Sequence, residues 1–248
     1  MQTIIDFWAM ANTLVIMFAL GLHDDSATTE RFSVWLYARV SMYNLIFPAI
    51  LLVVLQQMAL FSTASLSAMA LCIAAAGGTS AGAFVKQVNG SQSLIAQLII
   101  FLLVLSLLAI TAFSVLGWVN SSTLSLSSLA GYLLAITLLP LLLGRWVGRF
   151  FTQWASVWQA RMERLGSLLV ILLVLALALR YGQEILTGPI EPLLAAAVLV
   201  MSFVLPPLFE PHVAVRKTIV LATLVRNLTL VLSLLSVLPN AAHILPTV

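Results

Sequence analysis

The sequence predicts an all-helical integral membrane protein with about eight transmembrane helices. Of its 248 residues, 62% are apolar and only 8% are charged, whereas a soluble domain carries about 25% charged residues. Apolar runs of roughly 20 residues, the length that crosses a bilayer as a helix, recur along the whole chain. Lysines and arginines gather in every second loop between these runs. With a mean hydropathy of +1.14, most of the outer surface is expected to contact lipid.

Each apolar run is expected to form one span, because a helix bonds every backbone group within its own segment. The first run carries Asp6 and lacks both a basic leader and a small-residue cleavage site. It is therefore predicted to be a retained span rather than a signal peptide, and the absence of an organelle-targeting sequence favours a bacterial inner membrane. No polar stretch is long enough for a second domain, so residues 1–248 form one transmembrane domain. The predicted spans are 4–22, 40–61, 64–85, 94–118, 127–143, 166–180, 192–209 and 218–238.

The positive charges predict the orientation of these spans. Cytoplasmic loops carry an excess of lysine and arginine, and nine of the eleven positive residues fall in alternate loops. Arg180 alone lies on the opposite side, and Arg226 lies inside the last span. Both termini are therefore expected on the non-cytoplasmic side. The nine residues are Arg31, Arg39, Lys86, Arg145, Arg149, Arg161, Arg164, Arg216 and Lys217.

The longest cytoplasmic connection, 145–165, has an amphipathic pattern. Trp146, Phe150, Trp154 and Trp158 recur every four residues, beside arginines and a glutamine. This pattern is typical of a helix that lies at the membrane surface with its aromatic side chains at headgroup depth. A helix that binds a partner protein is the alternative. The membrane helix would link the two halves of the protein.

Two spans carry polar or flexible residues near their middle, where the other spans are almost wholly apolar. The third contains Gly77, Gly78, Thr79, Ser80 and Gly82, and the last contains Thr223, Arg226, Asn227 and Thr229. Glycine costs about 1 kcal/mol relative to alanine inside a helix, so three in six residues favour a break. Paired broken helices are typical of the binding site of a secondary transporter. Two alternatives remain open: Gly78 and Gly82 as a GxxxG packing face, and Arg226 as a snorkelling side chain.

Four segments of the chain resemble the bile acid:sodium symporter family, within the superfamily that includes arsenite exporters. They are LVIMFALGL at 14–22, AGGTSAG at 76–82, TLLPLLLG at 137–144 and RKTIVLATLVRNLTLVLSL at 216–234. The resemblance implies two inverted repeats, a panel domain, and a core domain in which two broken helices cross. This chain resembles a shortened member that lacks the first and last of ten helices. Its repeats would then cover 4–118 and 127–238.

The chain departs from the family at the positions that the resemblance makes sodium ligands. Arg226 stands for a glutamine, Ala76 stands for the crossover proline, and Tyr43 stands for another glutamine with Asn44 beside it. Only Asn227 is kept. A hard cation requires several oxygen ligands, so sodium coupling is not expected. The remaining ligand positions carry Ala81, Gly82, Ile95, Ile99 and Ala222.

The resulting hypothesis is a secondary transporter of a small organic anion, with lipid and that anion as partners. No cofactor, metal, nucleic acid or catalytic residue is expected, since no Ser–His pair, facing aspartates or HExxH motif lies at depth. A non-transporting subunit or scaffold of the same fold is the alternative, and a homo-oligomer or a partner that supplies the missing helices would fit either. The single cysteine, Cys72, excludes a disulfide framework within one chain. The predicted substrate and crossover residues are Asn44, Gly77, Gly78, Thr79, Ser80, Gly82, Thr223, Arg226 and Asn227.

Overall fold

The structure, a computed structural model, describes residues 2–22, 33–118 and 126–225, and this part of the chain contains helices and no strand. Four stretches are long and apolar enough to cross a membrane: Val34–Gln57, Gln92–Val115, Thr152–Gln183 and Ile190–Phe209. The helical membrane class is confirmed to this extent, and the full set of eight spans stays a prediction. In chain order the elements are α1 (Gln2–Leu22), α2 (Val34–Ser41), the π-helix η2 (Met42–Ile46), α3 (Phe47–Gln57), α4 (Thr63–Ala74), α5 (Ala81–Phe84), α6 (Gln92–Val115), α7 (Leu126–Phe150), α8 (Thr152–Thr187), α9 (Ile190–Val204), the 3₁₀ turn η3 (Pro206–Phe209) and α10 (Val213–Leu224).

Local capping sets where several helices begin. Ser33, Ser62 and Ser91 precede α2, α4 and α6, and each side chain accepts a hydrogen bond from a backbone N–H in the first turn. Such a cap satisfies one of the donors that a helix start leaves unpaired. Because of the Ser33 cap, the predicted 40–61 span is shifted toward the N-terminus: α2, η2 and α3 form one continuous helix over Val34–Gln57.

The predicted amphipathic helix 145–165 is not a separate element. Helix α7 continues to Phe150, and α8 begins at Thr152 and runs for 36 residues. No proline or glycine falls between 149 and 165, so nothing in the sequence stops the second helix early. The aromatic side chains still gather at this hairpin: the Trp154 and Trp158 rings lie 5.2 Å apart, and the Arg161 guanidinium lies 5.5 Å from the Trp158 ring centre.

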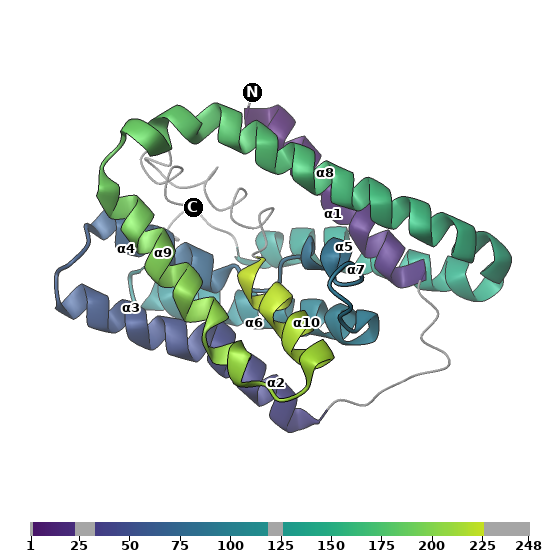
Figure 1. Cartoon of the computed structure of the whole chain (residues 1–248), viewed down its shortest axis with the longest axis horizontal. Helices are drawn as coiled ribbons and strands as arrows, with labels where there is room; N and C mark the ends of the chain where they lie inside the picture. The colour runs from purple at the N-terminus through teal and green to yellow at the C-terminus, as the bar shows by residue number, and fades with distance from the viewer. Residues whose placement is uncertain (1, 23–32, 119–125, 226–248) are drawn as a thin grey trace.

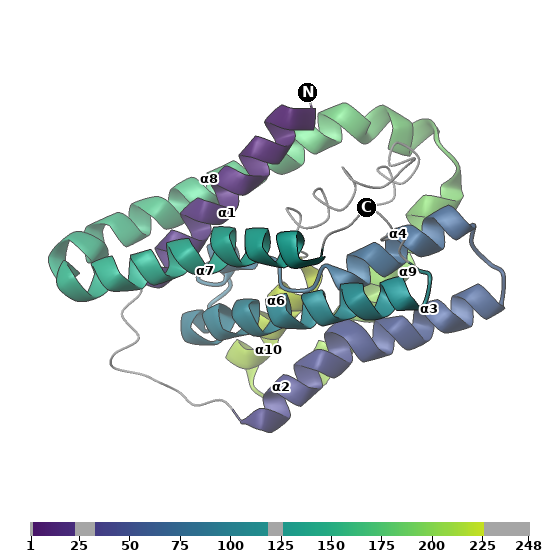
Figure 2. The same ribbon diagram turned by 180° about the vertical axis from the view of Figure 1, so that it is seen from behind.

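The helices form two groups. Helices α1, α7 and α8 pack mainly on one another, and we call them the three-helix layer. The segment α2–η2–α3 packs with α4, α6, α9 and α10, and we call these the main bundle. In Figure 1 and, from behind, in Figure 2, α1 and α8 run side by side along one edge while α3 and α9 lie toward the other. The short helix α5 contacts both groups, so the chain between α4 and α6 lies where they meet.

Glycine allows the closest contact within the three-helix layer. A methyl group on Gly144 of α7 would collide with the backbone of Phe18, and one on Gly21 of α1 would collide with the backbone of Leu141. Small residues let membrane helices approach closely and gain van der Waals contact. The TLLPLLLG segment thus ends at a packing contact rather than at a polar site.

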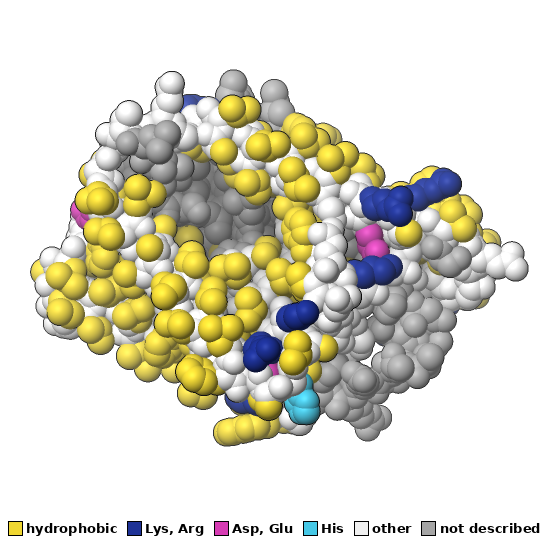
Figure 3. Space-filling view, viewed as in Figure 1, with side chains coloured by type: hydrophobic (Ala, Val, Ile, Leu, Met, Phe, Trp, Pro, Cys, Tyr) yellow, Lys and Arg dark blue, Asp and Glu magenta, His cyan; other side chains and the backbone are white. Residues whose placement is uncertain are grey.

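Charged side chains mark one end of the molecule. Figure 3 shows hydrophobic side chains over most of the visible face and most Lys and Arg side chains away from the α3 end. Loops that are predicted to lie on the same side of the membrane are in contact. Arg39 pairs with Glu210 at 2.6 Å, and Lys86 pairs with Glu163 at 3.3 Å. At the other end, the Ser62 N–H donates to Glu191. The sidedness of these ends in a membrane stays a prediction.

Candidate functional site

The helix break in the third predicted span lies between Ala74, where α4 ends, and Ala81, where α5 begins. The break therefore covers residues 75–80 and begins two residues before the predicted position, 77–82. Ala81 and Gly82 already belong to α5. Gly77 adopts a positive φ of 78°, and an added methyl group there would lie 2.6 Å from the Leu102 Cβ. Only glycine takes this conformation without cost. The broken segment is almost wholly buried.

A serine of α6 supports the broken backbone. The Ser106 hydroxyl lies 2.7 Å from the Ala76 carbonyl oxygen and 2.8 Å from the Leu102 carbonyl oxygen, and it can donate to either. Ser106 is fully buried. A carbonyl freed by a helix break needs such a donor, because no water reaches it there.

The end of α10 meets this break directly. Helix α10 ends at Leu224, Val225 is extended, and the Gly78 N–H donates to the Val225 carbonyl oxygen at 3.0 Å. The fully buried Thr223 hydroxyl lies 2.9 Å from the Ile219 carbonyl oxygen in the preceding turn. The two predicted interruptions are therefore in contact as far as Val225. The predicted site residues Arg226 and Asn227 lie outside the described residues.

Four neutral side chains join α1 to the break, and we call them the polar seam: Asn12, Thr13, Thr79 and Ser80. The Asn12 amide nitrogen lies 3.3 Å from the Ser80 hydroxyl, and the Thr13 and Thr79 hydroxyls lie 3.3 Å apart. Asn12 and Thr13 are each 2% exposed, and Thr79 is 3% exposed. The Asn12 amide oxygen is buried without a hydrogen-bond partner. The polar seam crosses from the three-helix layer to the segment that follows the main bundle's α4.

The predicted residues Gly82 and Asn44 have other surroundings. A methyl group on Gly82 would lie 2.5 Å from the Leu20 Cδ1, so this glycine allows α1 to pack on α5. The GxxxG alternative thus fits Gly82, whereas Gly78 lies in the break. Asn44 is fully buried in the π-helix η2, and its amide nitrogen donates to the Val40 carbonyl oxygen of its own helix at 3.0 Å. A π-helical turn often marks a functional position.

Five of the positions that the family resemblance assigns to the cation sites come together in an apolar cluster. Each of them is at most 1% exposed, and all belong to one hydrophobic core that α1, α5, α6 and α10 share. None of their side chains carries an oxygen atom, so they offer nothing to a hard cation. Among the described residues, no group of His, Cys, Asp or Glu could hold a metal ion. The clustered residues are Ala76, Ala81, Ile95, Ile99 and Ala222.

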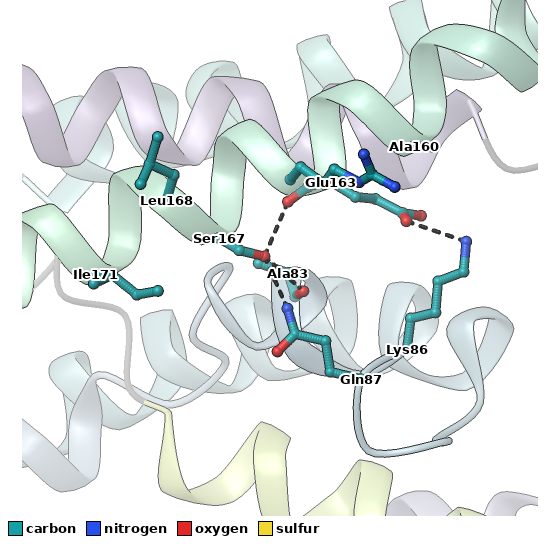
Figure 4. A pocket seen from close by; sticks show the side chains of 9 residues that line it. Ala83, Lys86, Gln87, Ala160, Glu163, Ser167, Leu168 and Ile171 are labelled. Carbon is teal, nitrogen blue, oxygen red and sulfur yellow. Dashed lines mark hydrogen bonds and ion pairs between the residues drawn. The ribbon is translucent and has the colours of Figure 1, made fainter.

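A charged cluster joins the same two parts of the molecule nearer its positive end (Figure 4). Glu163 of α8 pairs with Lys86 and accepts hydrogen bonds from Gln92 and Gln159, each at 3.0 Å. Beside it, the Gln87 amide donates to the Ser167 hydroxyl at 3.2 Å. The side chains of Lys86, Gln87, Glu163 and Ser167 border an open cavity of about 510 Å³, which Leu168 and Ile171 of α8 also line. We call this set the Glu163 cluster.

The prediction of site residues from the sequence left out Asn12, Thr13 and Ser106. The first two are adjacent polar residues at the middle of an otherwise apolar span, which is a recognisable pattern. Ser106 has no such mark, because a lone serine in a membrane helix usually bonds its own backbone. Only the fold shows that it also reaches the Ala76 carbonyl.

No protein-family model matches this chain, and no curated protein matches it either. The resemblance to the bile acid:sodium symporter family therefore rests on the four sequence segments.

Proposed function

We propose that this protein is a secondary transporter of a small organic anion and that it does not use sodium. The observation that carries the proposal is the buried helix break at 75–80, which lies between the two helix groups and against the end of α10. Irregular backbone at membrane depth is tolerated only where it is buried in protein or lines a cavity. In secondary transporters such breaks form the substrate site, and one group of helices moves against the other around it.

In this proposal the three-helix layer acts as the panel and the main bundle acts as the core. The chain would contain eight spans in two inverted repeats, with both termini on the non-cytoplasmic side of the inner membrane. The α4–α5 break and the end of α10 would be the two crossover elements. The contacts between loops of the same predicted side support this arrangement.

Sodium independence is supported by the apolar cluster at Ala81, Ile95, Ile99 and Ala222. A sodium ion placed there would lose its hydration shell and gain no side-chain oxygen from these four residues in return. Fixed positive charge would come from Arg226, the residue that follows Val225 in the chain. Arginine stays protonated at any physiological pH, so no bound cation is needed to attract an anion.

A ligand screen followed by transport measurements tests this proposal. The purified protein would be heated with a bile acid, a 2-oxo acid or an aromatic acid, with sodium or with potassium at constant ionic strength. A bound anion raises the unfolding temperature by mass action. We expect at least one class to stabilise the protein equally in both salts, and the same anion to enter proteoliposomes. An uptake that rises steeply with sodium would overturn the sodium-independent proposal.

Arg226 provides the matched variants. We expect Arg226→Gln to lose anion binding, because it removes the charge without restoring the other oxygen ligands, and Arg226→Lys to retain part of it. Lys86→Gln is the control for a positive charge outside the proposed site, and it should retain binding.

A non-transporting scaffold is the second candidate, and the apolar cluster favours it as well, since that cluster fills the family's ion positions. Binding of no tested anion and an absence of uptake, in a protein that unfolds cooperatively, would support the scaffold.

A further inference from the structure

The open cavity beside the Glu163 cluster is polar at one end and apolar at the other. Lys86, Glu163 and Arg164 line it nearer the positive end of the molecule, and Leu168 and Ile171 line it further along α8. These two apolar side chains are 52% and 50% exposed. Seven helical residues separate Arg164 from Ile171, which corresponds to a rise of about 10 Å. The cavity therefore offers charge and apolar surface to one elongated ligand.

The change from polar to apolar lining coincides with the predicted membrane boundary. Lys86 directly follows the predicted span 64–85, and Arg164 precedes the predicted span 166–180 by two residues. Ile171 lies within that second span. The boundary is the depth at which a phospholipid changes from headgroup to acyl chain. On the side of the membrane that the positive loops predict, this depth belongs to the cytoplasmic leaflet.

One positive charge of the cavity has no counter-ion. Lys86 pairs with Glu163 at 3.3 Å. Among the residues that the structure describes, Arg164 forms no ion pair and no side-chain hydrogen bond. The three charged side chains in the lining therefore leave a net charge of +1. A guanidinium presents a planar pair of N–H donors, which fits two oxygens of one phosphate group.

We propose that this cavity binds one anionic phospholipid of the cytoplasmic leaflet. The phosphate lies against Arg164 and Lys86, and an acyl chain covers Leu168 and Ile171. A headgroup with one net negative charge neutralises the cavity, whereas a zwitterionic headgroup brings a positive charge of its own and leaves the cavity at +1. Basic pockets between membrane helices on the cytoplasmic side suit anionic headgroups in this way. The proposal does not depend on transport and holds equally for a scaffold.

A lipid in this cavity would contact two separate parts of the chain (Figure 4). Ala83, Lys86 and Gln87 belong to α5 and the turn after it, and the other lining residues all belong to α8. The hydrogen bond from Gln87 to Ser167 already joins these two walls. A bound lipid adds contacts across the same junction, so it should raise the unfolding temperature by mass action.

Lipid titration of the purified full-length protein in detergent tests the proposal. Phosphatidylglycerol and phosphatidylethanolamine with the same acyl chains would be added separately, and native mass spectrometry would count the bound lipids. The first phosphatidylglycerol should bind about fivefold tighter than the first phosphatidylethanolamine, the ratio expected from one basic residue near an anionic headgroup. Inorganic phosphate and glycerol 3-phosphate lack acyl chains, and at the same concentration they should leave the unfolding temperature unchanged.

Two matched pairs of variants in α8 locate the lipid. Arg164→Gln should abolish the preference for phosphatidylglycerol, whereas Arg180→Gln, which removes an exposed arginine near the other end of the same helix, should retain it. Ile171→Gln should weaken the binding of phosphatidylglycerol about fivefold, because it removes apolar surface from the acyl-chain half of the cavity. Leu179→Gln changes an exposed apolar residue of α8 outside the cavity and should have no such effect.

Four results would overturn the proposal. They are equal binding of the two lipids to the unaltered protein, a preference that survives in Arg164→Gln, a preference that is lost in both arginine variants, and equal stabilisation by inorganic phosphate. The last would assign the cavity to a free anion instead of a lipid. None of these measurements involves the transported anion, so their failure leaves the proposed function intact, and an absence of anion uptake leaves the lipid site intact.

Discussion

The three-helix layer meets the rest of the molecule in two regions of different chemistry. The polar seam, at the level of the α1 midpoint, consists of neutral side chains that are nearly inaccessible and includes a buried group without a partner. The Glu163 cluster, near the positive end, consists of charged and amide side chains around an open cavity, and its Lys86 side chain is 61% exposed.

Because of this difference, we expect the polar seam to select a ligand by its chemistry and the Glu163 cluster to open easily. In a dry interior each hydrogen bond is strong and each missing bond is expensive, so the seam is suited to select a partner by its chemistry. At an exposed end, water replaces a lost contact at little cost, so the Glu163 cluster can open and close repeatedly. The transport movement that we propose would require both properties at the junction between the two helix groups.

The largest effect should come from the backbone that supports the seam. Gly77→Ala places a methyl group 2.6 Å from the Leu102 Cβ and forces a side chain into a positive φ. We expect a loss of about 2–4 kcal/mol in the free energy of unfolding, from strain and overpacking together. Thermal and denaturant unfolding in detergent would measure it.

Gly182→Ala is the matched control, because nothing lies within 4 Å of an added methyl group at that position of α8. It should be neutral or stabilising by up to about 1 kcal/mol, since alanine is the better helix former. Equal stability of the two variants would show that the break at 75–80 does not require a glycine at position 77.

An intermediate effect is expected at Ser106. Ser106→Ala leaves the Ala76 carbonyl without its buried donor and should cost about 1–2 kcal/mol of unfolding free energy. Thr111→Val removes a hydroxyl with the same bond to its own helix but at an exposed position, and it should change stability by less than about 0.5 kcal/mol. If Ser106→Ala and Thr111→Val lower the free energy of unfolding equally, the buried bond from Ser106 contributes no more than the exposed bond from Thr111.

The smallest effect is expected in the Glu163 cluster. A double-mutant cycle with Lys86→Met and Glu163→Gln should give a coupling free energy below about 1 kcal/mol that shrinks as salt is added. The pair is long, at 3.3 Å, and Lys86 is exposed. A coupling above about 2 kcal/mol that does not depend on salt would mean that the cluster is as rigid as the seam, and the contrast between the two regions would fail.

The sequence by itself determined the membrane class and the place of the first helix break. Composition restricts which solvent the surface can contact, and three glycines in six residues lower the cost of leaving the helix at a defined point of the chain. The separate 145–165 helix was a wrong prediction, because hydrophobic patterning identifies which face a helix buries but not where one helix stops and the next continues. The π-helix that holds Asn44 was not predicted either, since a π turn depends on packing against other helices.

Only the tertiary structure decided which residues meet. The Gly78 N–H donates to the Val225 carbonyl oxygen, and the Ser106 hydroxyl donates to the Ala76 carbonyl oxygen. The Asn12 amide donates to the Ser80 hydroxyl, 68 positions away in the sequence. Such pairings depend on how helices pack against one another, and packing is a property of many distant side chains at once. The same is true of the unpartnered Asn12 amide oxygen, because a missing hydrogen bond can be recognised only when the position of every neighbour is known.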